Sequence, residues 1–171
     1  ELDEDAKRVL RGFGLLSLKP WIVVANIAES GPLPDGLPED AIAISASLEA
    51  EVAGMDANEA AELLEGFGIK EAGLSRVISA CYRALDLITF LTTGEDETRA
   101  WEVRRGAHAP EAAGVIHSDL QRGFIRAEVI GYEELVAAGS WDAAKAMGQL
   151  RVEGKDYVVQ EGDVMHIRFA V

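Results

Sequence analysis

The sequence predicts a fold in two parts, an α/β segment followed by an α+β domain. In the first part, the short apolar runs WIVVA (Trp21–Ala25) and AIAIS (Ala41–Ser45) are typical of parallel strands that are buried on both faces. In the second part, which begins near Leu85, runs rich in β-branched and aromatic residues alternate apolar and charged positions, as half-buried strands do. An Ala-rich segment among these runs predicts a helix laid on one face of a sheet.

Composition and charge limit the possible functions. The chain has 171 residues and a net charge of −14. Up to Leu85 there are 7 basic and 15 acidic residues, and after it 9 and 15, so the two parts carry −8 and −6. This balance argues against a general affinity for DNA or anionic membranes, and any RNA contact must come from a local basic patch.

The pattern of apolar residues and cysteine indicates the compartment. No apolar run approaches the ~20 residues that a membrane-spanning helix needs. Cys81 is the single cysteine, so a disulfide framework is excluded and a reducing cytoplasm fits best. Because Cys81 lies on the apolar side of a predicted helix, we expect it to be a small core residue.

The first part begins with a predicted helix over residues 2–12, in which acidic residues lead and basic residues follow. The strand Trp21–Ala25, a proline-rich loop over residues 30–40 and the strand Ala41–Ser45 follow. Two strands alone would leave both faces of a sheet in water. We therefore expect their neighbours to belong to a region that precedes this chain.

Helices complete the first part. Two short acidic helices are predicted within Leu48–Gly68, the second with Asn58 as its N-cap and Gly66 as its stop. An amphipathic helix over Ser75–Leu85 then leads directly into the second part, because no flexible linker separates them.

The second part has the element order β-β-α-β with late strands added, which is a β-grasp arrangement similar to ubiquitin. Gly162 is expected at a positive-φ turn position between the last two strands. The predicted strands are residues 87–94, 98–106, 125–130, 150–160 and 164–170, with a turn at residues 94–97; the predicted helices are Pro110–Ile116, Tyr132–Ser140 and Trp141–Gly148.

Long motifs in the second part carry a family resemblance. The pattern TxGExExRAWxxRRGxxAPxAAGxIHxDxxxGFIRAEVI, together with the tail LRxEGKDYVVQEGDVMHIRF, resembles the C-terminal TGS domain of the YchF family, the Obg-like P-loop ATPases that associate with ribosomes. The resemblance implies the end of a P-loop nucleotide-binding domain with a helical connector over residues 1–84 and a TGS domain over residues 85–171. It also implies that the chain is the C-terminal half of such a protein.

A candidate nucleotide-base site lies at the end of the first predicted strand. Asn26, Ile27 and Glu29 occupy the positions of the Asn-Lys-x-Asp motif with which G proteins read guanine, but without its Lys and Asp. Ser45 and Ala46, at the end of the second strand, resemble the loop that closes the base pocket. The replacements favour ATP over GTP, as the family resemblance also implies. The alternative is that Asn26 and Glu29 only cap the next turn.

The elements that bind phosphate are not found in the sequence. It contains no G-x-x-x-x-G-K-[ST] motif, which would cradle the phosphates, and no Walker-B strand, which would supply a Mg²⁺ ligand. The family resemblance implies ATP or GTP with Mg²⁺ in the whole protein. The 171 residues by themselves should carry no catalytic residues and should not bind nucleotide tightly or hydrolyse it.

Two further groups of side chains suggest sites in the second part. His117 and Asp119 have a spacing that can serve a metal, but no third ligand is evident and structural roles explain the histidines equally well. Arg104, Arg105, Arg122 and Arg126 form a candidate patch for ribosomal RNA, with Phe124 available to stack on a base. The alternative is that neighbouring acids neutralise these arginines as ordinary surface pairs.

Two functions follow from these observations. The first is the C-terminal half of a cytoplasmic, ribosome-associated ATPase, in which the first part selects the base and the second docks on the ribosome. The second is a stand-alone TGS module that binds RNA or protein and has no nucleotide role.

Overall fold

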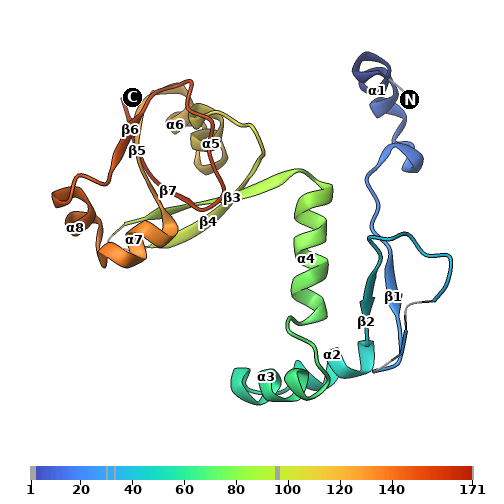
Figure 1. Cartoon of the computed structure of the whole chain (residues 1–171). Helices are drawn as coiled ribbons and strands as arrows, with labels where there is room; N and C mark the ends of the chain where they lie inside the picture. The colour runs from blue at the N-terminus through green and yellow to red at the C-terminus, as the bar shows by residue number, and fades with distance from the viewer. Residues whose placement is uncertain (1–2, 30, 33, 95–96, 171) are drawn as a thin grey trace. The chain divides into compact units, whose positions relative to one another are not determined.

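The computed structural model divides into two compact units, Glu1–Leu85 (unit 1) and Asp86–Val171 (unit 2) (Figure 1). The described residues are 3–29, 31–32, 34–94 and 97–170. Parts of three sequence predictions lie outside them: Leu2 of the first helix, positions 30 and 33 of the proline-rich loop, and Glu95 and Asp96 of the turn. No helix in the described part of the chain is long and apolar enough to cross a membrane.

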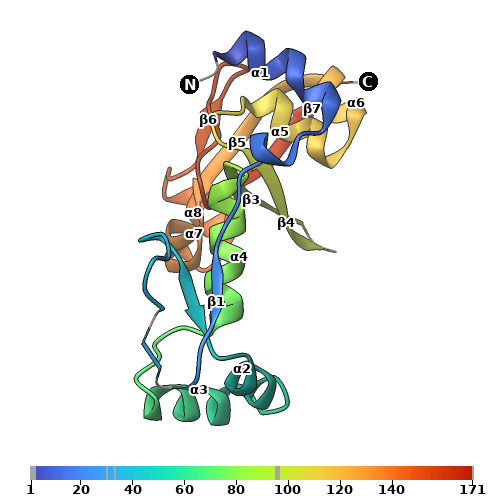
Figure 2. The ribbon, with the colours of Figure 1, turned by 90° about the vertical axis from the view of Figure 1, so that its right-hand side faces the viewer.

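Unit 1 contains one pair of parallel strands with helices before and after it (Figures 1 and 2). Its elements are α1 (Glu4–Leu10), the 3-10 turns η1 (Arg11–Phe13) and η2 (Leu16–Leu18), β1 (Val24–Asn26), β2 (Ile42–Ile44), α2 (Ala46–Val52), α3 (Ala57–Gly66) and α4 (Gly73–Ala84). The α/β character expected from the sequence is confirmed.

The prediction that the first strand is buried on both faces is wrong. β1 begins only at Val24, which is 39% exposed, and Trp21 is 75% exposed. β2 fits better, because α4 packs against it: Gly73 lies close to the Ile44 side chain, and the Arg76 guanidinium donates to the Ala43 carbonyl oxygen at 3.0 Å. A two-stranded sheet offers each strand only one neighbour, so the apolar run of β1 is left partly open.

The helices of unit 1 differ from the predictions in two ways. α3 is capped by Asp56, whose carboxylate accepts from the backbone N–H groups of Asn58 and Glu59, so Asn58 is not the N-cap. α4 buries the small residues Gly73 and Ala80, whereas Cys81 is exposed and is not a core residue. Small residues allow a helix to approach a sheet closely. The buried face of α4 is therefore the one that carries its small residues and not the one that carries its larger apolar side chains.

Unit 2 is a five-stranded sheet with helices on both of its faces (Figure 1). Its strand order is β4-β3-β7-β5-β6; β3 and β7 are parallel, and the other neighbours are antiparallel. Its elements are β3 (Leu87–Thr93), β4 (Thr98–Arg104), α5 (Ala109–Ile116), α6 (Ser118–Arg122), β5 (Phe124–Gly131), α7 (Tyr132–Ala138), α8 (Trp141–Ala146), β6 (Arg151–Glu153) and β7 (Asp163–Phe169).

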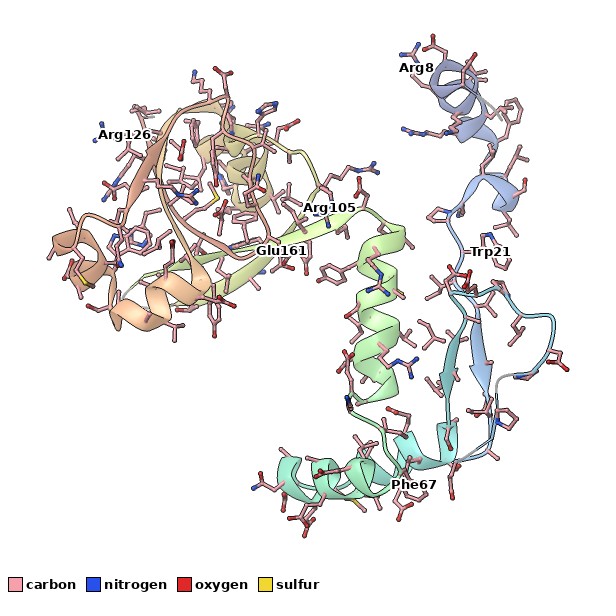
Figure 3. All side chains as sticks on the ribbon, viewed as in Figure 1. Arg8, Trp21, Phe67, Arg105, Arg126 and Glu161 are labelled. Carbon is pink, nitrogen blue, oxygen red and sulfur yellow. The ribbon has the colours of Figure 1, made fainter. Side chains whose placement is uncertain are left out.

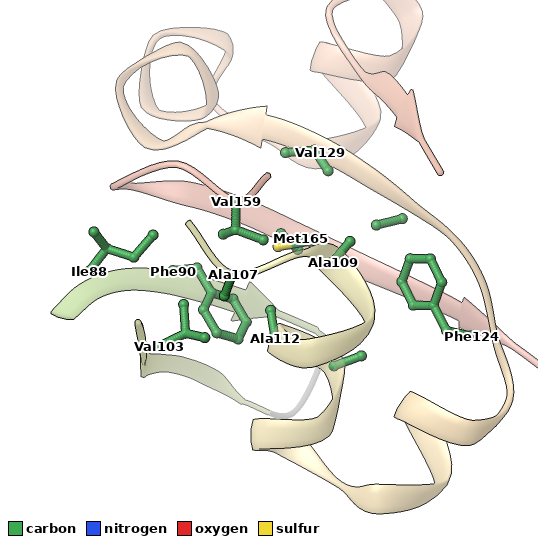
Figure 4. Packing of buried hydrophobic residues seen from close by; sticks show 12 residues of the cluster. Ile88, Phe90, Val103, Ala107, Ala109, Ala112, Phe124, Val129, Val159 and Met165 are labelled. Carbon is green, nitrogen blue, oxygen red and sulfur yellow. The ribbon is translucent and has the colours of Figure 1, made fainter. Parts of the chain in front are cut away.

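The core of unit 2 lies between the sheet and α5 (Figure 4). Phe90 and Met165 point from the central strands toward Ala112 and Ala113 of α5, and all four side chains are fully buried. α5 begins where it does because the Glu111 carboxylate accepts from the His108 backbone N–H at 2.7 Å and because Pro110 lies in the first turn. The alanines keep the helix close to the sheet.

The opposite face of the sheet is covered at one end by α7 and α8. Ile130 of β5, Val164 of β7 and Ala144 of α8 form a second buried cluster there. The two clusters use alternate residues of the same strands, as the two-residue repeat of a strand requires. The faces are called the α5 face and the α8 face below.

Three sequence predictions for unit 2 differ from the structure. Phe124, expected to stack on a base, is 3% exposed and belongs to the α5-face core, because it pairs with Phe169 at the end of the sheet. The strand expected over residues 150–160 is only Arg151–Glu153, and the short helix α6 was not predicted. Gly162 has the expected positive φ, 78°.

Candidate functional site

The candidate base site of unit 1 lies at the carboxyl ends of β1 and β2. These strands are parallel and in register, with Asn26 opposite Ile44, so the residues that follow each strand meet at one edge. The Asn26 Oδ1 accepts a hydrogen bond from the Ala46 backbone N–H at 3.1 Å. Two motifs that lie 20 residues apart in the sequence are thereby joined side by side.

The residues around this bond fix its position. The Ile27 N–H donates to the Ile44 carbonyl oxygen at 2.8 Å, which extends the ladder by one step. Ser45 is buried and caps α2, because its Oγ accepts from the Leu48 N–H at 3.4 Å; it also contacts the Ser47 Oγ at 2.9 Å. Ser45 is therefore buried beneath the candidate site and holds the start of α2 in place, whereas Asn26 and Ala46 are exposed to solvent.

The exposed groups have the chemistry needed to read a base edge. An Asn carboxamide offers one acceptor and two donors, and it can bind the N6 and N7 groups of adenine together. Asn26 and Ala46 are both exposed, and so is Glu29, which lies beyond the strand end. The Asn26 Oδ1 bonds to the backbone N–H of Ala46, the first residue of α2, so Asn26 has a structural role toward that helix, and its binding of a base stays a prediction.

The four arginines predicted as one patch lie in different parts of unit 2. Arg104 is on β4 and Arg126 is on β5, and β3 and β7 lie between these two strands. Figure 3 shows Arg105 and Arg126 projecting from separate parts of the unit. Arg105 pairs with Asp86 at 3.3 Å. Arg122 pairs with Asp119, and its hydrogen bond lowers the pKa of that carboxyl group.

The histidines of unit 2 have structural partners. His117 ends α5 and caps α6, where its Nδ1 accepts from the Asp119 N–H at 3.2 Å. His108 Nδ1 lies 3.1 Å from the Asp156 carbonyl oxygen. His166 contacts the Thr93 carbonyl oxygen and stacks on Trp141 with ring centroids 3.9 Å apart. Within the described residues, no three His, Cys, Asp or Glu side chains gather as metal ligands would.

A buried polar cluster in unit 2 was missed by the sequence reasoning. Asp163 is 2% exposed, and its carboxylate accepts from the Tyr157 hydroxyl at 2.7 Å, the Arg151 guanidinium at 3.1 Å and the Gln160 N–H at 2.8 Å. Burial, followed by this bond to Asp163, raises the pKa of Tyr157 to about 12. The burial of Asp163 could have been predicted from the two-residue repeat of a strand, because Asp163 lies two positions before the buried Met165 and therefore faces the same side of the sheet.

Known proteins resemble both units. The YchF-GTPase_C family model, described as a protein of unknown function (DUF933), matches residues 87–170. Proteins named ribosome-binding ATPase YchF from Pasteurella multocida and Bacillus subtilis are 44% and 43% identical over the whole of this chain, which covers 50% of each. A solved structure titled as the YchF GTPase of Schizosaccharomyces pombe is 30% identical with a TM-score of 0.84, and the match covers 98% of this chain and 48% of that one.

The chain thus spans about half the length of the curated relatives that it matches. The likeness to those relatives runs through unit 1 as well as unit 2, whereas the family model matches unit 2 alone. The chain belongs to the YchF family and corresponds to the C-terminal part of its members.

Proposed function

We propose that this chain supplies the base-selecting edge and the ribosome-docking domain of a protein that binds and hydrolyses ATP, with GTP as a poorer ligand. The observation that carries the first role is the bond between the Asn26 side chain and the Ala46 backbone. It unites the two loops that a purine would contact, at the end of parallel strands where open α/β sheets bind ligands. Asn26 reads the base edge, Ile27 lines its plane, and Glu29 stands where a guanine-reading Asp would be.

Unit 2 is, in this proposal, a β-grasp domain of the TGS type that docks on the ribosome. Its strand order, with the first and last long strands β3 and β7 parallel at the centre and α5 across one face, supports the β-grasp assignment. The proteins from Pasteurella multocida and Bacillus subtilis are named as ribosome-binding, which supports the docking role. A cytoplasmic site of action follows from that role. DNA and membranes are not proposed as partners, since unit 2 carries a net charge of −6 in total.

The residues of this chain fit a nucleotide base but not its phosphates. The exposed Asn26 carboxamide offers its Nδ2 donors and its oxygen to a base, whereas the sequence has no P-loop Lys or Ser/Thr for phosphate and Mg²⁺. ATP with Mg²⁺ supplies the phosphoryl group and its charge compensation when bound by the full-length protein. The 171 residues alone should show no ATP hydrolysis above background, and measurable turnover would contradict the proposal.

The decisive experiment exchanges the base-reading residues in the full-length protein that carries this sequence. The double substitution Ile27→Lys with Glu29→Asp restores the guanine-reading pair, so the ratio of GTP affinity to ATP affinity should rise about tenfold or more, the effect of one well-placed polar contact on discrimination. Titration with fluorescent nucleotide analogues measures both affinities. Ser47→Ala is the control, because Ser47 lies in the first turn of α2 beside the site but contacts Ser45 and not β1.

An unchanged selectivity ratio in the double variant, with both nucleotides still bound, would show that this edge does not choose the base. If the wild-type full-length protein bound neither nucleotide, the alternative of a stand-alone TGS module would be favoured instead.

A further inference from the structure

The α8 face of unit 2 is only partly covered. α7 and α8 lie over Ile130 and Val164, at one end of β5 and β7. Toward the other end of these strands the same face carries charged and polar side chains. We call this region the cationic face; its members are Arg126 and Glu128 of β5, His166 and Arg168 of β7, and Lys145 of α8.

Two arginines lie directly opposite each other on the cationic face. Arg126 of β5 is the register partner of Arg168 of β7. The register shifts between Phe124 and Arg126, so that two residues of β5 oppose one of β7 at this point. This irregularity places Phe124 in the α5-face core and Arg126 on the α8 face, although a regular strand would put both on one side. Bulges of this kind re-aim a side chain.

The acidic partners on this face do not balance the cations. Arg168 donates to the Glu128 carboxylate at 2.9 Å, and that carboxylate is only 14% exposed. The hydrogen bond from Arg168 holds the pKa of Glu128 below its usual value, and the charges of Lys145 and His166 act in the same direction. Within the described residues Arg126 has no ion pair, and its side chain is exposed.

Two arginines on neighbouring strands, one of them without an ion pair among the described residues, offer a place for an anion. Like charges directly across a strand pair destabilise a sheet. Here the Arg168 guanidinium is held in place by the Glu128 carboxylate. The Arg126 guanidinium has no such partner among the described residues and can turn toward a bound anion. Two guanidinium groups side by side can each donate to one of the non-bridging oxygens of a phosphate. Lys145, at the border of the face, can meet a neighbouring phosphate as a point charge.

We propose that Arg126 and Arg168 bind a backbone phosphate of ribosomal RNA, with Lys145 on an adjacent phosphate. This inference rests on the proposed ribosome association and replaces the four-arginine patch with a different set. It assigns no role in RNA binding to Arg105 or Arg122, which are paired with Asp86 and Asp119. Contacts of this kind fix position and carry no sequence information, so the site should tolerate any base sequence.

The test uses the full-length protein with two probes, purified ribosomes and a single-stranded poly(U) oligomer. Arg126→Ala should weaken binding of both about fivefold to tenfold at low salt, because one phosphate contact is lost. The slope of log affinity against log salt should become shallower by about one. Arg126→Lys should keep the slope and recover part of the affinity. Arg122→Ala is the matched control, an exposed arginine of the same unit, and should change affinity by less than about twofold.

The outcomes separate the inference from the function on which it rests. Ribosome binding by the wild type together with unchanged affinity and slope in Arg126→Ala would overturn the phosphate site but leave the docking role. Weaker ribosome binding with an unchanged salt slope and unchanged poly(U) binding would indicate a contact with a ribosomal protein, and would also overturn it. Absence of ribosome binding by the wild type would remove the docking role, and poly(U) would then test the phosphate site alone.

Thermal unfolding confirms that each variant is folded, and Arg126 suits this test because its removal leaves no buried carboxylate unpaired.

Discussion

The two units bury their apolar residues to different extents. Of the described residues that form the buried hydrophobic core, five belong to unit 1 and fifteen to unit 2. Unit 1 exposes large side chains from its first turns, with Phe13 at 72% and Leu16 at 81%, and from α4, with Leu74 at 65%. Unit 2 packs helices from its own sequence on both faces of its sheet, although the α8 face is covered only at one end.

The difference in core burial between the two units also applies to the candidate sites that they carry. The cationic face stands on a sheet whose five strands and two cores all come from residues after Leu85. The candidate base site is built on two strands of three residues each, held by α4 and a few hydrogen bonds. We therefore expect the fold of unit 2 to tolerate surface changes, and the base site of unit 1 to depend on single contacts.

The largest expected effect is the loss of a core side chain in unit 2. Phe90 is fully buried between the sheet and α5, so Phe90→Ala should lower the free energy of unfolding of unit 2 by about 3–5 kcal/mol. Phe13→Ala in unit 1 is the control for the same chemical change at an exposed position, and should cost within about 0.5 kcal/mol. Urea unfolding followed by circular dichroism measures both. Equal costs would break the comparison between the units.

A smaller effect is expected where α4 meets α2 in unit 1. α4 has no side-chain cap of its own; instead the Glu49 carboxylate of α2 accepts from the N–H groups of Gly73 at 2.6 Å and Leu74 at 3.2 Å. Glu49→Ala should therefore cost about 1–2 kcal/mol and speed hydrogen exchange at these two amides. Glu51→Ala, an exposed change in the same helix, is the control. Slow exchange in both variants would show that α4 is held mainly by its packing on β2.

The smallest effect concerns the polar cluster of unit 2 and its dependence on pH. Tyr157→Phe removes the hydroxyl bond to Asp163, which should cost about 1 kcal/mol near neutral pH. The folded pKa of Tyr157, about 12, lies above its ordinary value of 10.0. Its contribution is therefore complete below pH 10 and is lost as the pH rises toward 12.

The pH dependence is read from the difference between wild type and Tyr157→Phe in urea unfolding at several pH values. That difference should shrink above pH 10 and nearly vanish by about pH 12. Tyr132→Phe is the control, since Tyr132 is 54% exposed. A constant difference between the two proteins across this range would mean that the Asp163 cluster does not hold the tyrosine in its protonated form.

Local signals in the sequence were enough to place most of the elements, although the bounds of β1 and β6 and the presence of α6 were not predicted. The alternation in residues 87–94 and 98–106 corresponds to β3 and β4, and two acidic helices and the α5 segment occur in the expected regions, although the N-cap of α3 is Asp56 and not Asn58. The positive φ of Gly162 follows from turn chemistry alone. These features depend on neighbours within a few residues, so a single sequence contains the information. The candidate base-site residues were placed at strand ends in the same way, and their binding of a base stays a prediction.

Tertiary structure decided which side chains meet. Cys81 is exposed because Gly73 and Ala80 let α4 approach β2 by another stripe, and Phe124 is buried because a register shift turns it toward α5. The strand order separates Arg126 from Arg104, and the pairing of β5 with β7 sets Arg126 opposite Arg168. The sequence by itself determined most of the strands and helices and placed the two candidate base-site segments at strand ends. The strand order, the shift and the burial of Asp163 depend on pairing between distant segments, and only the folded chain brings those segments together.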